Sequence, residues 1–178
     1  MTVAQPSGFL TTLMNQAVAI HHRLGELGQL RRLANLGVET RYVFLYSRPD
    51  KWDNSSLSTG PAPVKLEDGN WLLFYDIDNL WPVQDPKLPF PYYGRCSLGW
   101  AILDAKNLTK VLARAEEPLV YAQLPWEVDG FTPLVVYTMG IKSEGNDLFT
   151  LYAGGGDRVV EAFSVKVTGS GHGHYNVM

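Results

Sequence analysis

Charge is scarce in this sequence and is not gathered into a basic block. Of the 178 residues 19% are charged, with 15 lysines and arginines against 18 aspartates and glutamates, so the formal net charge is -3. Proteins that grip nucleic acid through its phosphates need clustered basic side chains. We therefore expect no nucleic acid partner. The hydrophobic content of 46% is typical of a globular chain and excludes a disordered one.

Cysteine and long apolar runs are also scarce. Cys96 is the single cysteine, so no disulfide can form within the chain and no oxidising compartment is needed. The sequence contains no run of about 18 apolar residues, which a helix would need to span a bilayer. Its first residues also lack the basic start of a signal peptide. We expect a cytoplasmic protein with no membrane partner. No set of ligands has the spacing of a metal site, so neither a metal nor a cofactor is predicted.

Aromatic side chains and turn formers are abundant instead. The chain has 5 Trp, 9 Tyr, 7 Phe, 17 Gly and 11 Pro. This composition favours strands, turns and aromatic-lined pockets, and helical bundles rarely show it. The length predicts a single domain over residues 1–178.

One strand–turn–strand pattern occurs twice. The stretch "PVKLEDGNWLLFYDIDN" aligns with "VVYTMGIKSEGNDLFTLYAGGGD". Because Gly and Asn tolerate the positive φ of tight turns, we predict hairpin turns at residues 68–70 and 144–146. A further strand is predicted after each hairpin, at residues 93–103 and 158–167. Repeated units of three or four short antiparallel strands predict an all-β fold of the β-propeller type, although an ordinary meander or sandwich has the same periodicity.

The two ends of the chain are less regular. Apolar residues at helical spacing between residues 10 and 36 predict a helix, which several glycines weaken, so residues 1–40 are interpreted as irregular, helical or the remnant of a first blade. A strand is predicted over residues 41–47, and helix is expected only in the first third of the chain. We interpret residues 41–168 as propeller blades and residues 169–178 as a flexible tail.

Three segments carry a resemblance to a known family. They are "STGPAPVKLEDGNWLLFYDID", "GWAILDAKNLTKVLARAEEPLV" and "LPWEVDGFTPLVVYTMGIKSEGNDLFTLYAGGGD". In order and spacing they resemble the C-terminal part of glycoside hydrolase family 130, the five-bladed β-propellers that are mannoside phosphorylases and β-mannosidases. The resemblance implies a partial propeller of about three blades. It also implies a glycosidase-like protein that acts on or binds β-mannosides or related oligosaccharides.

Two motifs of that family are not matched. The family's general acid is an aspartate in a Glu-Asp-Pro-Arg motif, and this sequence has no Asp-Pro-Arg. The family's phosphate-binding histidine corresponds here to Asp76, and a carboxylate repels a phosphate dianion. Any activity is therefore predicted to be hydrolytic, with inorganic phosphate disfavoured as a ligand. The alternatives are a non-catalytic carbohydrate-binding or interaction module, and an all-β fragment of a larger enzyme or assembly.

Asp76 and Asp78 are the candidate catalytic residues. They flank Ile77 at the end of an apolar strand, so their side chains are expected on one face. On a pocket face they could bind sugar hydroxyls, and Asp76 is the candidate base that activates a water in inverting hydrolysis. The alternative is a solvated loop in which the aspartates cap a turn.

Five further residues are candidate sugar contacts. Trp81 lies in a proline-rich loop and Tyr93 follows that loop; aromatic rings stack on sugars, although most aromatics in β folds are core residues. By the resemblance, Arg23 contacts phosphate or sugar, Glu127 is a pocket or structural acid, and Asp157 contacts sugar.

A propeller with about three blades leaves sheet faces and strand edges uncovered. We therefore expect the chain to associate with itself or with a partner, or residues 10–36 to fold across those faces. Without the family's general acid, the isolated chain is expected to be a poor catalyst or none, because loss of that acid costs roughly 10²- to 10⁴-fold in rate.

Overall fold

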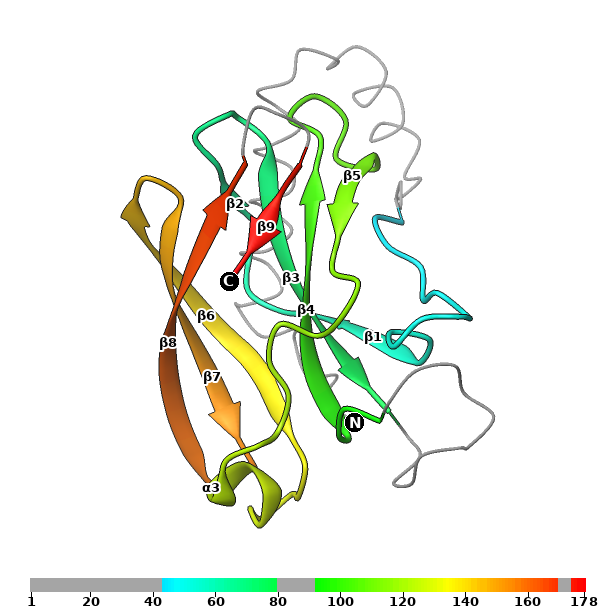
Figure 1. Cartoon of the computed structure of the whole chain (residues 1–178), viewed down its shortest axis with the longest axis vertical. Helices are drawn as coiled ribbons and strands as arrows, with labels where there is room; N and C mark the ends of the chain where they lie inside the picture. The colour runs from blue at the N-terminus through cyan, green and yellow to red at the C-terminus, as the bar shows by residue number, and fades with distance from the viewer. Residues whose placement is uncertain (1–42, 80–91, 170–173) are drawn as a thin grey trace, which may run out of the picture. The chain divides into compact units, whose positions relative to one another are not determined.

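The computed structural model describes residues 43–79, 92–169 and 174–178. These residues form two antiparallel β-sheets and one turn of helix (Figure 1). Sheet A contains β1 (Ser56–Thr59), β2 (Val64–Lys65), β3 (Trp71–Asp78), β4 (Cys96–Leu103) and β5 (Val111–Arg114). Sheet B contains β6 (Val136–Gly145), β7 (Leu148–Gly155), β8 (Val159–Thr168) and β9 (Asn176–Val177). The helix is α3 (Pro125–Val128).

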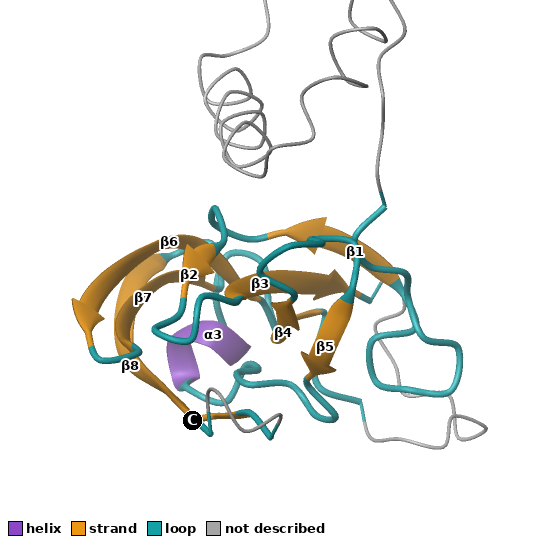
Figure 2. Cartoon of the chain, turned by 90° about the horizontal axis from the view of Figure 1, so that it is seen from above, coloured by secondary structure: helices purple, strands orange, loops and turns teal. Residues whose placement is uncertain are grey.

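Strands in each sheet pair mainly with their neighbours in sequence. The strand orders are β1-β3-β4-β5, with β2 also on β3, and β6-β7-β8-β9. The two sheets lie side by side (Figure 2), and the predicted third strands are β4 and β8. The all-β prediction is confirmed. About three blades were predicted, and the described residues form two of them.

Both predicted hairpins are present. In the first turn the Gly69 amide donates to the Leu66 carbonyl at 3.0 Å, and Gly69 has a φ of 90°. The second turn lies slightly later than predicted, at Asn146 and Asp147, whose φ values are 53° and 55°. Positive φ at both central residues is the geometry that matches the twist of two paired strands, and Asn and Asp adopt it more readily than other side chains.

The strand predicted over residues 41–47 is wrong for its described part. Residues 43–48 have no regular secondary structure. The Tyr46 carbonyl accepts a hydrogen bond from the Arg114 side chain at 2.7 Å instead of from a neighbouring strand. A side chain holds this segment on sheet A, because Leu45 packs against an apolar cluster that includes Leu73 and Tyr75 of β3.

The prediction that helix is confined to the first third of the chain is also wrong, because α3 lies in the second half. Pro125 stands in its first turn, where the missing N–H of proline costs nothing. The Glu127 carboxylate accepts the amides of Gln123 and Leu124 at 2.6 and 2.7 Å, which satisfies donors at the start of the helix. The structure predicted for residues 1–40 lies outside the described residues.

The flexible tail predicted over residues 169–178 is wrong for residues 174–178, which contain the strand β9, and residues 170–173 lie outside the described residues. Val177 of β9 pairs with Val167 of β8 and is buried in the main core. The Tyr175 hydroxyl donates to Asp68 and accepts from Asn70, both at 2.6 Å. One apolar residue and one tyrosine therefore tie the C-terminal segment to both sheets, in a stretch that composition alone marks as loop.

The main core lies between the two sheets. Side chains from β3 and β4 meet side chains from β7 and β8, in a cluster that includes Leu72, Phe74, Leu98, Ile102, Phe149, Leu151 and Val165. A second cluster covers the opposite face of sheet A and includes Trp52, Leu73, Tyr75, Ile77 and Ala101. Sheet A is therefore packed on both faces.

Candidate functional site

Three of the predicted acids lie around Cys96 at the start of β4. Asp76 and Asp78 lie at the end of β3 and Asp157 follows β7. Burial, and after it the charges of these three acids, raise the pKa of the Cys96 thiol to about 12. Each carboxylate therefore lies near Cys96, and the thiol is protonated and unreactive at neutral pH. We call Asp76, Asp78 and Asp157 the acid group.

A backbone joint between the two sheets brings these strand ends together. The Leu134 carbonyl accepts the amides of Arg95 and Cys96 at 2.8 and 3.1 Å. Leu134 has a φ of 62°, an unfavourable value for a side chain of this kind. The strained residue turns the chain so that β6 starts beside the end of β3.

Asp76 is buried between the sheets, with only 3% of the residue exposed. Its Oδ1 accepts the Thr138 amide at 3.0 Å, and the Thr138 hydroxyl lies 3.1 and 3.0 Å from its two oxygens. Burial raises the pKa of Asp76 to about 6, although both hydrogen bonds from Thr138 oppose the shift. Asp76 thus links β3 to β6. Its role as a base stays a prediction, and its burial counts against that role.

Asp78 is placed differently from Asp76. It is half-buried, and its Oδ1 atom is buried with no hydrogen-bond partner in the part of the chain that the structure describes. The two aspartates lie two residues apart on β3, so they share a face as predicted. An unsatisfied carboxylate oxygen is rare in native proteins and calls for an explanation, such as a hydrogen-bond donor from a ligand that reaches it.

Asp157 lies in the exposed turn between β7 and β8. The Thr132 hydroxyl donates to its Oδ2 atom. Burial, and after it the Asp157 charge, raise the pKa of Tyr137. The ring of Tyr137 covers Gly154, where any Cβ would lie 2.7 Å from ring atoms. This contact explains why a side chain is excluded at Gly154, one of the three glycines before Asp157.

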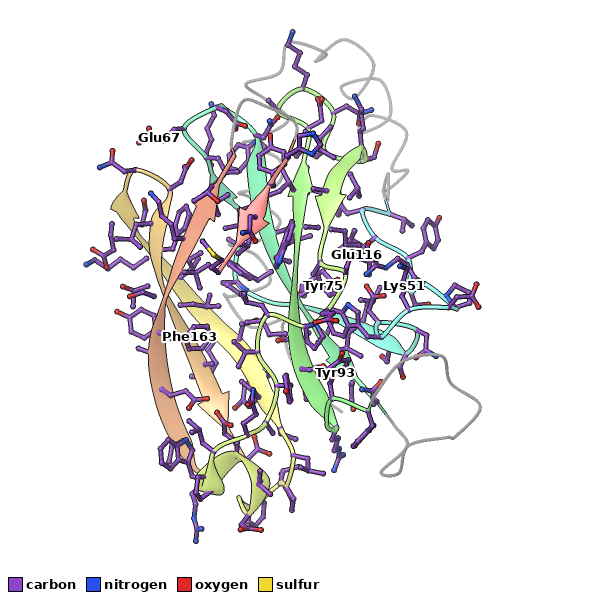
Figure 3. The ribbon with its side chains drawn as sticks, in the orientation of Figure 1. Lys51, Glu67, Tyr75, Tyr93, Glu116 and Phe163 are labelled. Atoms are coloured by element: carbon purple, nitrogen blue, oxygen red, sulfur yellow. The ribbon has the colours of Figure 1, made fainter. Side chains whose placement is uncertain are left out.

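The remaining predicted site residues do not join the acid group. Tyr93 packs against the second cluster on the opposite face of sheet A, with ring centroids 6.5 Å from Trp52 and 5.1 Å from Tyr121 (Figure 3). Glu127 uses its carboxylate within α3. Arg23 and Trp81 lie outside the described residues.

Sequence reasoning missed Thr132 and Thr138, which hold Asp157 and Asp76. Thr138 lies in the inward phase of β6 with Val136, and a polar residue there was the available signal.

Within residues 43–79, 92–169 and 174–178, no group of three or more His, Cys, Asp or Glu could hold a metal ion. No helix in this part of the chain is long and apolar enough to cross a bilayer.

Relatives with the same sequence pattern are mannoside-active proteins. The family model described as beta-1,4-mannooligosaccharide phosphorylase, glycoside hydrolase family 130, matches residues 35–169. A beta-1,2-mannobiose phosphorylase of Thermoanaerobacter sp. (strain X514) is 32% identical over 120 residues, which are 65% of this chain and 35% of that protein. A 1,2-beta-oligomannan phosphorylase of the same organism is 31% identical over 115 residues, 63% of this chain and 33% of that protein.

A solved structure shows the same arrangement of strands. It is the beta-1,2-mannobiose phosphorylase from Listeria innocua in complex with beta-1,2-mannobiose, which matches with 28% identity and a TM-score of 0.55, over 69% of this chain and 31% of that one. This chain spans about a third of the length of the relatives it matches. The two sheets are therefore blades of a propeller-type fold, and the chain belongs to glycoside hydrolase family 130.

Proposed function

We propose that this chain supplies part of the sugar pocket of a protein that acts on β-linked mannosides, with Asp78 and Asp157 accepting hydrogen bonds from sugar hydroxyls. The observation that carries the proposal is that carboxylates from two blades, at the ends of β3 and β7, lie around Cys96 at the start of β4. Asp78 offers an oxygen that has no donor among the described residues, and Asp157 is exposed. Sugar hydroxyls supply many donors in one ligand, and hydrogen bonds to ionised acceptors are the stronger kind.

The ligand class follows from the relatives. Two of them are named for phosphorolysis of β-1,2-linked mannosides, and one was solved with beta-1,2-mannobiose bound. We take a β-linked manno-oligosaccharide as the ligand of this chain also. Arg23, Trp81, Tyr93 and Glu127 remain proposed contacts, and Tyr93 and Glu127 require a ligand that reaches beyond the acid group.

Hydrolysis is the proposed reaction, and phosphorolysis is disfavoured. Asp76 stands where the resemblance places a phosphate-binding histidine, and a carboxylate at that position repels a phosphate dianion. One observation favours the alternative, a non-catalytic mannoside-binding module: the carboxylate of Asp76 is buried and engaged by Thr138, so it is not free to activate water. Inverting hydrolysis needs an acid and a base about 6.5–9.5 Å apart with room for a water.

Calorimetric titration of the full chain with beta-1,2-mannobiose tests the proposal. We expect binding by the wild type, and about tenfold or greater weakening in Asp78→Asn and Asp157→Asn, because a hydrogen bond to a charged group contributes about 1.5–3 kcal/mol. Glu144→Gln is the matched control, since that carboxylate is occupied by Lys142 in an exposed pair beside the β6–β7 turn.

Absence of binding, or equal affinity of all variants, would contradict the proposed pocket. Incubation of the same proteins with manno-oligosaccharide separates the reaction classes. Free mannose with no need for phosphate supports hydrolysis, mannose 1-phosphate formed only with phosphate contradicts it, and binding without turnover supports the binding module.

A further inference from the structure

A charged residue interrupts the apolar face of β8. Phe163, Val165 and Val167 point toward the core, and Val160 and Ala162 point outward and are exposed. Glu161 falls in the inward phase, next to Phe163, which Figure 3 shows on sheet B. A carboxylate in such a row is costly unless its oxygens find donors or it holds a proton.

The two oxygens of Glu161 have different surroundings. Oε2 accepts the Trp126 indole N–H at 3.2 Å, and Oε1 is buried with no hydrogen-bond donor among the described residues. The side chain that approaches it is another acid. A Cβ added to Gly155 would lie 3.2 Å from Glu161 Oε1 and 3.3 Å from Glu127 Cγ, so the two glutamate side chains lie next to each other over Gly155.

The surroundings of this pair decide which acid takes the proton. Glu127 Oε2 already accepts two backbone amides, so this oxygen is held as an acceptor. Glu161 has no such donors, and burial, and then the charge of Glu127, raise its pKa, while the Trp126 hydrogen bond opposes the shift. Both acids line a cavity of about 380 Å³ whose lining contains no lysine, arginine or histidine. Glu127 is therefore the other titratable side chain of this lining that faces Glu161.

We propose that Glu127 and Glu161 share one proton, carried by Glu161 Oε1, and that this pair holds α3 against the turn that carries Asp157. The turn is bound to the segment after α3 in two places: the Thr132 amide donates to the Gly156 carbonyl at 3.0 Å, and the Gly156 amide donates to the Val135 carbonyl at 2.8 Å. A Cβ on Gly130 would also meet Gly156, so the two backbones are in close contact.

Loss of the proton reverses the interaction within the pair. Two ionised carboxylates this close to each other repel, and the element beside them that can yield is the single helical turn α3. Glu161 is then a positioning residue for Asp157. That last step rests on the proposed function, whereas the shared proton does not.

Carboxyl NMR of the full chain labelled at glutamate tests the shared proton, together with thermal unfolding as a function of pH. We expect one glutamate to titrate above the usual range. Since the folded state holds a proton that the unfolded chain releases at lower pH, the unfolding midpoint should fall, by about 2–4 °C, as the pH rises through that titration. In Glu161→Gln the amide donates to Glu127 permanently, so this part of the fall should disappear. Glu144→Gln should keep this fall, because hydrogen bonds from Lys142 and Thr150 lower the pKa of Glu144 and its titration lies below that range.

Normal titration of every glutamate in the wild type would overturn the shared proton, even if Glu161→Gln failed to fold. An unchanged pH profile in Glu161→Gln would overturn it as well. The affinity for beta-1,2-mannobiose, measured over the same pH range, tests the link to Asp157. If the glutamates share a proton but the affinity does not change with pH, only the positioning role of Glu161 is overturned. Lack of mannobiose binding at every pH would overturn the proposed function and leave the NMR result standing.

Discussion

Sheets A and B contain the same strand–turn–strand sequence pattern, but the surroundings of their outer faces differ. Tyr75 on β3 and Tyr152 on β7 occupy matching positions in the two repeats. Tyr75 is 2% exposed and Tyr152 is 39% exposed. The same residue in the same local pattern is therefore a core residue in one sheet and a surface residue in the other.

The difference arises from the segment that precedes β1. Trp52 stacks on Tyr75 with ring centroids 6.1 Å apart, and Asp53 accepts the Tyr75 hydroxyl at 2.9 Å. Asp53 is fully buried and also bound by Arg48 and Arg114, at 2.8 and 2.6 Å. Figure 3 shows Tyr75 on sheet A. A buried charge of this kind is tolerated because cations and hydrogen bonds surround it.

Sheet B has no such cover on its outward face among the described residues. Met139, Leu148, Tyr152 and Val160 are exposed there, with Val160 at 70%. Apolar residues exposed on one sheet face are typical of interaction surfaces. The predicted self-association or partner contact has this face as its candidate, and it stays a prediction.

The largest test of the comparison replaces the two tyrosines in turn. Tyr75→Ala should lower the free energy of unfolding by about 3–5 kcal/mol, because it removes a buried aromatic ring. Tyr152→Ala should cost about 1 kcal/mol or less, since the ring is already partly in water. Urea unfolding of the two variants and the wild type measures both values. Equal losses would mean that the outward face of sheet B is covered in solution.

A smaller effect is expected where the two sheets meet, at Asp76. Its folded pKa of about 6 lies above the ordinary value of 3.8, so the folded state binds more protons than the unfolded chain between these pH values. The wild type should therefore lose stability as pH rises from about 4 to about 6. Asp76→Asn should reduce this loss by about 2–3 kcal/mol.

Urea unfolding at several pH values measures that difference. Asp50→Asn, a change at an exposed aspartate, is the control and should leave the pH dependence as it is. An unaltered pH dependence in Asp76→Asn would show that Asp76 is already ionised and well solvated in the folded protein.

The smallest expected effect is at Leu134, at the joint between the sheets. Its φ of 62° costs a leucine about 1–2 kcal/mol, and asparagine tolerates this region better. Leu134→Asn should raise the free energy of unfolding by up to about 1 kcal/mol, because lost packing against Val136 and Ala153 offsets part of the gain. Leu119→Asn, a change at another partly buried leucine without positive φ, should destabilise. Equal destabilisation in both variants would contradict strain at Leu134.

Several features of the fold could be predicted because their causes are local. Turn residues with positive φ, such as Gly69 and Asn146, end one strand and start the next wherever they occur. Alternation along β3 placed Asp76 and Asp78 on one face for the same reason. The strand predicted over residues 41–47 failed in its described part because Leu45 packs on sheet A through its side chain, with no strand pairing. No local pattern distinguishes that packing from strand pairing.

The sequence by itself determined the strands, the hairpins and the family, because each depends on neighbouring residues or on ordered motifs along the chain. Only the tertiary structure decided which residues contact each acid. Asp76 is bound by Thr138, which is 62 residues further along the chain. Glu161 lies next to Glu127 over Gly155, and no local sequence pattern indicates this contact. Burial and charge act through space, so the protonation and the exposure of these carboxyl groups are properties of the packed sheets.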